Sequence, residues 1–227
     1  MRAHVAFTPD QVIEAPVAIV VDVLRATSTI AQALASGYKR VYCCREVEDA
    51  RALRDKLGQG LLGGERNAVP IPGFDLGASP REVLEPRGET LIYSTTNGTR
   101  AVLAAVSRCR EVVLGSLLNL EAVARAVHGD CVVVCAGFQG QFALDDAYCA
   151  GRIVQLLGAD GSDAAKASVV LARAFPTAWD GLMARTYGPP GLEEDIKFCA
   201  QESVLEVVPR VSRMVESAAE ITLSGQS

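Results

Sequence analysis

The segment spanning residues 17–30 constrains the fold of this chain more than any other. Residues 17–21 are apolar without a break, Asp22 and Arg25 follow, and three hydroxyl residues at 27–29 open a helical pattern. A continuous apolar run is typical of a strand buried on both faces, as in the middle of a parallel sheet. Ligands of such sheets bind just beyond the carboxyl ends of the strands, where Asp22 and Arg25 would lie. A carboxylate, a cation and a helix N-terminus together could hold a metal ion and an anionic group.

Apolar strand-like runs alternate with helical patterns along the rest of the chain. We expect strands at residues 18–21, 40–44, 61–62, 91–93, 112–114 and 132–135. We expect helices at residues 28–36, 47–57, 100–109, 120–127, 145–157, 164–174 and 192–200. Gly37, Gly58 and Gly158 stand where helix C-caps are expected. This alternation predicts an α/β fold: a layered, mostly parallel or mixed sheet flanked by helices.

The length of 227 residues allows one large unit or two small ones. We predict a single catalytic α/β unit over residues 1–227. The alternative is two tightly packed lobes, the second beginning near residues 115–130.

Two segments break the alternation of strands and helices. Residues 68–86 contain four prolines and predict a long loop, and long ordered loops in compact domains are usually functional. Residues 187–191, Tyr-Gly-Pro-Pro-Gly, predict a turn or flap before the last helical pattern. The end of the chain, residues 223–227, is expected to be frayed.

Composition excludes several classes of partner. With Lys+Arg 22 and Asp+Glu 27, the net charge of −5 argues against nucleic acid or an anionic membrane as the main partner. No charge-free apolar stretch approaches ~18 residues, so no membrane span is expected. The first residues lack the features of a signal peptide, and we expect a cytoplasmic protein. The 7 cysteines are irregularly spaced and predict reduced, mostly buried thiols, not zinc ligands.

Hydroxyl and amide residues follow the strand predicted at 91–93. Such residues cap helix N-termini and occupy turns, so capping alone is one interpretation. One cap, however, needs only one or two of them, and Gly98 would let a ligand approach the backbone closely. We therefore expect an anion cradle that includes the hydroxyl residues at the start of the first helix: Thr27, Ser28, Thr95, Thr96, Asn97, Gly98 and Thr99.

Four acidic residues lie on separate loops that follow strands. Glu65 comes after two glycines, Asp75 lies in the long loop, and Asp146 opens a helix, where a favourable helix-dipole contact is the alternative. Hard cations prefer several oxygen ligands. Together with Asp22, this set predicts a Mg²⁺ site.

These stretches together resemble the 2-phosphosulfolactate phosphatase family of coenzyme M biosynthesis. The resemblance is carried by residues 22–27, 63–66, 73–80, 94–99, 135–137, 144–146, 150–151 and 195–196 with Pro209, in order over most of the chain. The sequence departs from the family at Ala78, where Asn is usual, and at Asp145-Asp146, where a Glu-Asp type pair is usual. Residues 187–191 match least.

The resemblance implies Mg²⁺-dependent hydrolysis of a phosphate monoester of a small anionic hydroxy acid, from 2-phosphosulfolactate to sulfolactate and phosphate. It implies catalytic roles for Asp22, Arg25, Glu65 and Arg66. The metal ligands would be Asp22, Glu65, Asp75 and Asp146. The two arginines would clamp oxyanions, because a planar guanidinium suits them; the alternative is that one arginine only holds its loop.

Other readings stay open at this point. The chain lacks the Cys–Arg spacing of cysteine phosphatases and the Gly-Lys-Ser/Thr of a P-loop, and His4 and His128 lie outside the motifs. An aspartyl-phosphate enzyme of haloacid dehalogenase type is an alternative, although Leu24 stands where that family has a second Asp. A noncatalytic sensor of a phosphorylated acid is another. A homodimer is expected as the candidate assembly.

Overall fold

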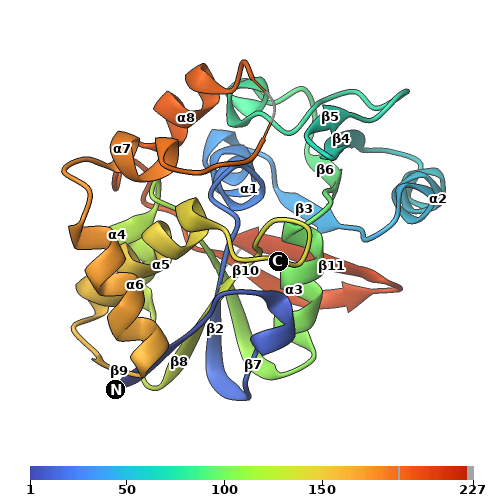
Figure 1. The fold of residues 1–227 in the computed structure, drawn as a ribbon. Helices are drawn as coiled ribbons and strands as arrows, with labels where there is room; N and C mark the ends of the chain where they lie inside the picture. The colour runs from blue at the N-terminus through green and yellow to red at the C-terminus, as the bar shows by residue number, and fades with distance from the viewer. Residues whose placement is uncertain (189, 224–227) are drawn as a thin grey trace.

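A single mixed sheet forms the middle layer of the fold (Figure 1). The structure is a computed structural model that describes residues 1–188 and 190–223. Its strands are β1 (Arg2–Ala6), β2 (Ala15–Val21), β3 (Arg40–Cys43), β4 (Leu61–Arg66), β5 (Val69–Pro70), β6 (Thr90–Ser94), β7 (Cys109–Gly115), β8 (Cys131–Cys135), β9 (Asp160–Gly161), β10 (Pro209–Val215) and β11 (Ala218–Leu223). In the described part of the chain they form one 11-stranded sheet of order β5-β4-β6-β3-β11-β10-β7-β2-β8-β1-β9.

The hairpin of β10 and β11 lies in the centre of this sheet, between two groups of parallel strands. It pairs antiparallel with β7 on one side and with β3 on the other. β3, β6 and β4 run parallel to one another, and so do β7, β2, β8 and β1. The predicted α/β class with a mixed sheet flanked by helices is confirmed.

Helices cover both faces of the sheet. They are α1 (Ala26–Ser36), α2 (Val47–Leu57), α3 (Gly98–Val106), α4 (Leu120–Ala126), α5 (Leu144–Leu157), α6 (Asp163–Arg173), α7 (Ala178–Met183) and α8 (Glu193–Cys199). The side chains of α1 and α3 pack on one face, against Ala18 and Val20 of β2. The alternate residues of β2, Val17 and Ile19, face the opposite side of the sheet, which α4–α8 cover. Helix α2 packs on this second face too, against β3, β4 and β6. Because both faces are buried, β2 has the continuous apolar sequence from which its position was predicted.

All predicted strands and helices are present, with small differences at their ends. Gly37, Gly58 and Gly158 cap α1, α2 and α5 in the left-handed conformation, as predicted. The helix expected at 100–109 begins and ends earlier, because β7 already starts at Cys109. Not predicted were five strands and one helix: β1, β5, β9, β10, β11 and α7. The hairpin strands lack a continuous apolar run; β10 contains Arg210 and Arg213.

The segments predicted as loops contain little regular structure. Residues 68–86 contain β5 and a short 3₁₀ helix at Pro80–Val83. The Thr29 hydroxyl of α1 anchors this loop, because it donates to the Ala78 carbonyl at 2.8 Å. Of the end predicted to fray, Leu223 is the last residue of β11, and residues 224–227 lie outside the described residues, as does Pro189 of the predicted flap. Across residues 1–188 and 190–223, no helix is long and apolar enough to cross a bilayer.

The central hairpin gives a first testable prediction. Ile221 of β11 is fully buried in the core formed with α1 and α3. We expect Ile221→Ala to lower the free energy of unfolding by about 2–5 kcal/mol, because it leaves a cavity in that core. Met214→Ala, on the exposed side of the same hairpin, should change it by less than about 0.5 kcal/mol. Urea unfolding measures both, and equal losses would contradict a hairpin that packs as a core element.

Candidate active site

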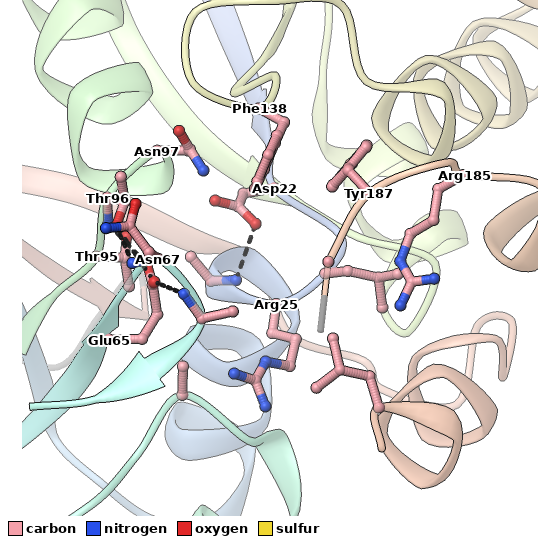
Figure 2. Close-up of a pocket in the computed structure, with 16 residues that line it drawn as sticks. Asp22, Arg25, Glu65, Asn67, Thr95, Thr96, Asn97, Phe138, Arg185 and Tyr187 are labelled. Atoms are coloured by element: carbon pink, nitrogen blue, oxygen red, sulfur yellow. Dashed lines mark hydrogen bonds between the residues drawn. The ribbon is translucent and has the colours of Figure 1, made fainter. Parts of the chain in front are cut away.

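The carboxyl ends of β2, β4 and β6 surround one pocket, although these strands belong to both parallel groups of the sheet (Figure 2). Asp22 follows β2, Glu65 lies at the end of β4, and Thr95 follows β6. The polar residues that line the pocket are Asp22, Arg25, Glu65, Asn67, Thr95, Thr96, Asn97, Arg185 and Tyr187. The topology therefore brings together residues from distant parts of the chain, as is usual at the carboxyl edge of an α/β sheet.

The N-termini of α1 and α3 meet at Asp22. The backbone N–H of Ala26, the first residue of α1, donates to Asp22 Oδ1 at 3.2 Å. Gly98, the first residue of α3, is so close that a Cβ there would lie 2.5 Å from Ala26 Cβ and 2.7 Å from Asp22 Oδ2. The first N–H groups of a helix have no partner within the helix and carry partial positive charge. Two such ends on one pocket make a site for an anion such as phosphate.

Asp22 is a strongly perturbed carboxyl group. Only 7% of the residue is exposed, and this burial raises its pKa from 3.8 to about 7. The negative charges of Glu65 and Asp145 add to the increase, whereas the Ala26 N–H and the positive charge of Arg25 oppose it. This carboxyl group therefore titrates near neutral pH, which suits acid–base chemistry.

Glu65 holds the loops on the opposite side of the pocket. Its Oε1 accepts from the Thr96 N–H at 2.7 Å, and its Oε2 accepts from the Ala68 N–H at 2.6 Å. Asn67 and Ala68 both have positive φ angles, 53° and 63°, in the tight turn between β4 and β5. A left-handed alanine is unusual and costs conformational energy. The two hydrogen bonds to Glu65 offset this cost and stabilise the turn beside the pocket.

Asp145 and Asp146 lie at the start of α5, and Asp145 is close enough to Asp22 for its charge to raise the pKa of that carboxyl group. The two oxygens of Asp146 accept from the N–H groups of Val23 at 2.9 Å and Gly137 at 3.0 Å, which joins the loops after β2 and β8. The Tyr187 hydroxyl donates to Asp145. Burial, followed by the charge of Asp145, raises the pKa of Asp146 well above its usual range. Asp146 therefore acts in this structure as a brace between loops.

Arg25 lies in the pocket in an ion pair with Asp195 of α8. Its Nη1 is 2.5 Å from Asp195 Oδ2, and both side chains are about one-tenth exposed. The other carboxylate oxygen of Asp195 accepts from the Ser79 hydroxyl at 2.6 Å. Asp195 thus fixes the position of the Arg25 guanidinium and balances its charge.

Other predicted site residues are not brought to the pocket. The Arg66 guanidinium donates to the carbonyls of Glu65 and Arg45 and to the Ser94 hydroxyl, each at 2.8 Å, and so holds its own loop. Asp75 is exposed, and its Oδ2 accepts from the Leu62 N–H at 2.8 Å.

The predicted cradle residues divide into two groups. Thr95, Thr96 and Asn97 line the pocket. The remaining four stabilise the helix ends that surround the pocket. The hydroxyls of Thr27 and Ser28 donate to the carbonyls of Asp22 and Val23, respectively. Gly98 allows the close helix contact, and the Thr99 N–H donates to the Thr95 hydroxyl.

The donor set of the pocket is compatible with Mg²⁺. Within residues 1–188 and 190–223, no group of three His, Cys, Asp or Glu side chains is arranged to enclose a metal ion. Mg²⁺, however, is commonly held by one or two carboxylates, with water and substrate phosphate oxygens completing its octahedron. Asp22 and Glu65 supply two carboxylates, whose mutual repulsion a cation would relieve.

Several residues of the pocket wall were not predicted from the sequence, and three of them have large side chains: Phe138, Arg185 and Tyr187. The Phe138 and Tyr187 rings stack with centroids 4.3 Å apart, above Asp22 in Figure 2. All three lie in irregular segments, so neither periodicity nor a strand end marked them. The only signal was the predicted flap at residues 187–191.

The fold and the pocket define an α/β protein with an anion-binding site of helix N-termini and carboxylates, as a phosphatase requires. A model of the 2-phosphosulpholactate phosphatase family matches residues 4–214. The chain is 38% identical to a "probable 2-phosphosulfolactate phosphatase" of Carboxydothermus hydrogenoformans, over 92% of each chain. It is 41% identical to one of Caldanaerobacter subterraneus (85% of this chain and 86% of the relative) and 37% identical to one of Thermus thermophilus (92% and 94%). The chain belongs to the 2-phosphosulpholactate phosphatase family and is a phosphoric monoester hydrolase.

The contact between the two helix ends can be tested at Gly98. We expect Gly98→Ala to lower the free energy of unfolding by about 1–3 kcal/mol, because the new methyl group overlaps Ala26 and the Asp22 carboxylate. Gly88→Ala is the matched control, since a Cβ there has no neighbour closer than 3.9 Å. Urea unfolding measures the stability of both variants. An unchanged free energy of unfolding in Gly98→Ala would show that the helix ends do not meet.

The pKa of Asp22 predicts how stability depends on pH. Because the folded state holds this proton more tightly, the contribution of Asp22 to stability is lost as the pH rises from about 4 to about 7. Asp22→Asn keeps the shape of the side chain but cannot ionise, so the variant does not lose stability as the pH rises. We expect it to stabilise the metal-free protein by roughly 2 kcal/mol more at pH 8 than at pH 5. Asp55→Asn on exposed α2 is the control, and a gain that does not vary with pH would contradict the buried acid.

Proposed function

We propose that this chain hydrolyses 2-phosphosulfolactate to sulfolactate and phosphate in a Mg²⁺-dependent reaction. The observation that carries the proposal is the meeting of two helix N-termini at the buried Asp22 carboxyl group. The names of the relatives supply the substrate. This substrate combines a phosphate ester with a carboxylate and a sulfonate, so it needs a pocket that neutralises several negative charges.

The residues of the pocket have distinct tasks in this proposal. The N-termini of α1 and α3 attract the phosphate oxygens through the positive ends of their helix dipoles, because the Ala26 and Thr99 N–H groups already have partners. Arg25, held by Asp195, stabilises the charge that spreads over these oxygens during transfer. Asp22 orients the attacking water and takes its proton as the bond to phosphorus forms, and the sulfolactate oxygen gains a proton as the ester bond breaks. Mg²⁺, when held by Asp22 and Glu65, would supply further charge neutralisation.

Direct attack by water is preferred over a phosphorylated aspartate. Enzymes of the haloacid dehalogenase type use a second Asp close to the nucleophile, and here Leu24 lines the pocket at that place. Acid quenching with labelled substrate separates the two mechanisms, because a trapped acyl-phosphate on Asp22 would contradict attack by water.

The proposal also places the enzyme in the cytoplasm. Its support is the thiol chemistry of the described residues, in which all seven cysteines are free and six of them are buried. Free thiols persist in reducing compartments.

The activity is tested by phosphate release from 2-phosphosulfolactate. EDTA should abolish turnover, and added Mg²⁺ should restore it. Asp22→Asn should lower kcat/KM by more than the ~10- to 100-fold that is typical of residues acting behind a metal ligand. Asp55→Asn should retain the wild-type rate. Full activity in metal-free buffer would contradict the proposed Mg²⁺ dependence. Binding of 2-phosphosulfolactate without release of phosphate would indicate a noncatalytic sensor.

A further inference from the structure

Arg185 is a cation of the pocket wall that the proposed phosphate chemistry does not use. It lies between α7 and Tyr187, is half-buried, and lines the pocket on the side opposite Glu65 (Figure 2). Its guanidinium lies against the backbone of Gly188, where a Cβ would be 3.5 Å from Nη2. This segment belongs to neither helix N-terminus, so Arg185 stands apart from the place where phosphate binds.

Arg25 and Arg185 differ in how their charges are balanced. Arg25 forms a short ion pair with Asp195, so most of its charge is compensated within the protein. Among the described residues, no carboxylate lies within ion-pair distance of Arg185. The positive charge of Arg185 lowers the pKa of the buried Asp145, but the two groups form no ion pair. A half-buried guanidinium that is not engaged in an ion pair can donate to an anion that arrives from solution.

The charges therefore divide the pocket into two ends. Asp22 and Glu65 lie at one end, where the helix N-termini and a cation would hold a phosphate group. Arg185 lies at the other end, on the side opposite Glu65. A simple alkyl phosphate would occupy only the first end. A phosphate ester with a second acidic group would occupy both.

We propose that Arg185 binds the second acidic group of the substrate and so selects phosphate monoesters that carry a carboxylate or sulfonate close to the ester. This inference rests on the proposed function, because it assumes that phosphate occupies the end of the pocket near Asp22. The planar guanidinium can donate two parallel hydrogen bonds to either group. Arg185 is thus a specificity-determining residue, separate from the groups that act on phosphorus.

The experiment compares three phosphate esters on the wild-type enzyme, Arg185→Gln and Arg185→Lys. The esters are 2-phosphosulfolactate, 2-phospholactate, which has the carboxylate but no sulfonate, and p-nitrophenyl phosphate, which has neither. Arg173→Gln is the matched control, since Arg173 is exposed at the end of α6 and is not among the residues that line the pocket. Steady-state phosphate release gives kcat and KM, and titration calorimetry gives the affinity for sulfolactate, which lacks the phosphate.

We expect Arg185→Gln to lower kcat/KM for 2-phosphosulfolactate by about 10- to 100-fold, mainly through KM, as for the loss of a charged hydrogen bond. The value for p-nitrophenyl phosphate should change less than about threefold, and Arg185→Lys should recover part of the loss. A matching loss on 2-phospholactate assigns Arg185 to the carboxylate; a loss confined to the sulfonated ester assigns it to the sulfonate.

Three outcomes would overturn the inference. Equal losses on all esters would place Arg185 on the phosphate group, and no loss on any would place it outside the site. Unchanged sulfolactate affinity in Arg185→Gln would also contradict it. The proposed function fails separately: a wild-type protein that binds sulfolactate through Arg185 but does not hydrolyse 2-phosphosulfolactate would contradict the function and keep the binding role.

Discussion

The rest of the site depends on the contact between the first turns of α1 and α3. Because position 98 is glycine, the N-terminus of α3 reaches Ala26 and the Asp22 carboxylate directly. The two helices begin on strands of different parallel groups, β2 and β6, and both pack on the same face of the sheet. Their meeting therefore fixes the relative positions of the two groups at the carboxyl edge, and it gives one buried carboxyl group two helix ends as neighbours.

Carboxylates hold the loops around this contact in place. Glu65 fixes the turn after β4, and Asp146 joins the loops after β2 and β8. Asp195 positions the Arg25 guanidinium through an ion pair. Each accepts hydrogen bonds from backbone or side-chain donors, so the cost of burying its charge is partly offset. Asp22 and Asp146 carry a further cost, because repulsion from neighbouring carboxylates adds to that of their burial. The protein concentrates negative charge where its chemistry would gain from a cation, at the expense of stability.

The sequence was most informative where one physical cause dominates. Burial on both faces produced the apolar run of β2, and the left-handed caps required glycine at Gly37, Gly58 and Gly158. Asp22, Glu65 and Thr95 were predicted because they stand at the ends of strands, and parallel strands end at one edge of a sheet. Arg66 resembles a ligand-binding arginine in sequence, yet tertiary contacts with backbone carbonyls decide its role. Arg185 and Phe138 lie in irregular loops, whose course depends on packing that no local pattern encodes.

The central place of the β10–β11 hairpin has a consequence for how the protein is made on the ribosome. The hairpin follows every other strand in the chain, yet it fills the gap between β3 and β7. Until it emerges, the growing chain holds two partial sheets, each with an unpaired inner edge that can recruit strands from other molecules. The α1 and α3 crossovers keep these partial sheets near each other during that interval. Closure of the sheet is then a late, non-local step, which is expected to limit the rate of folding.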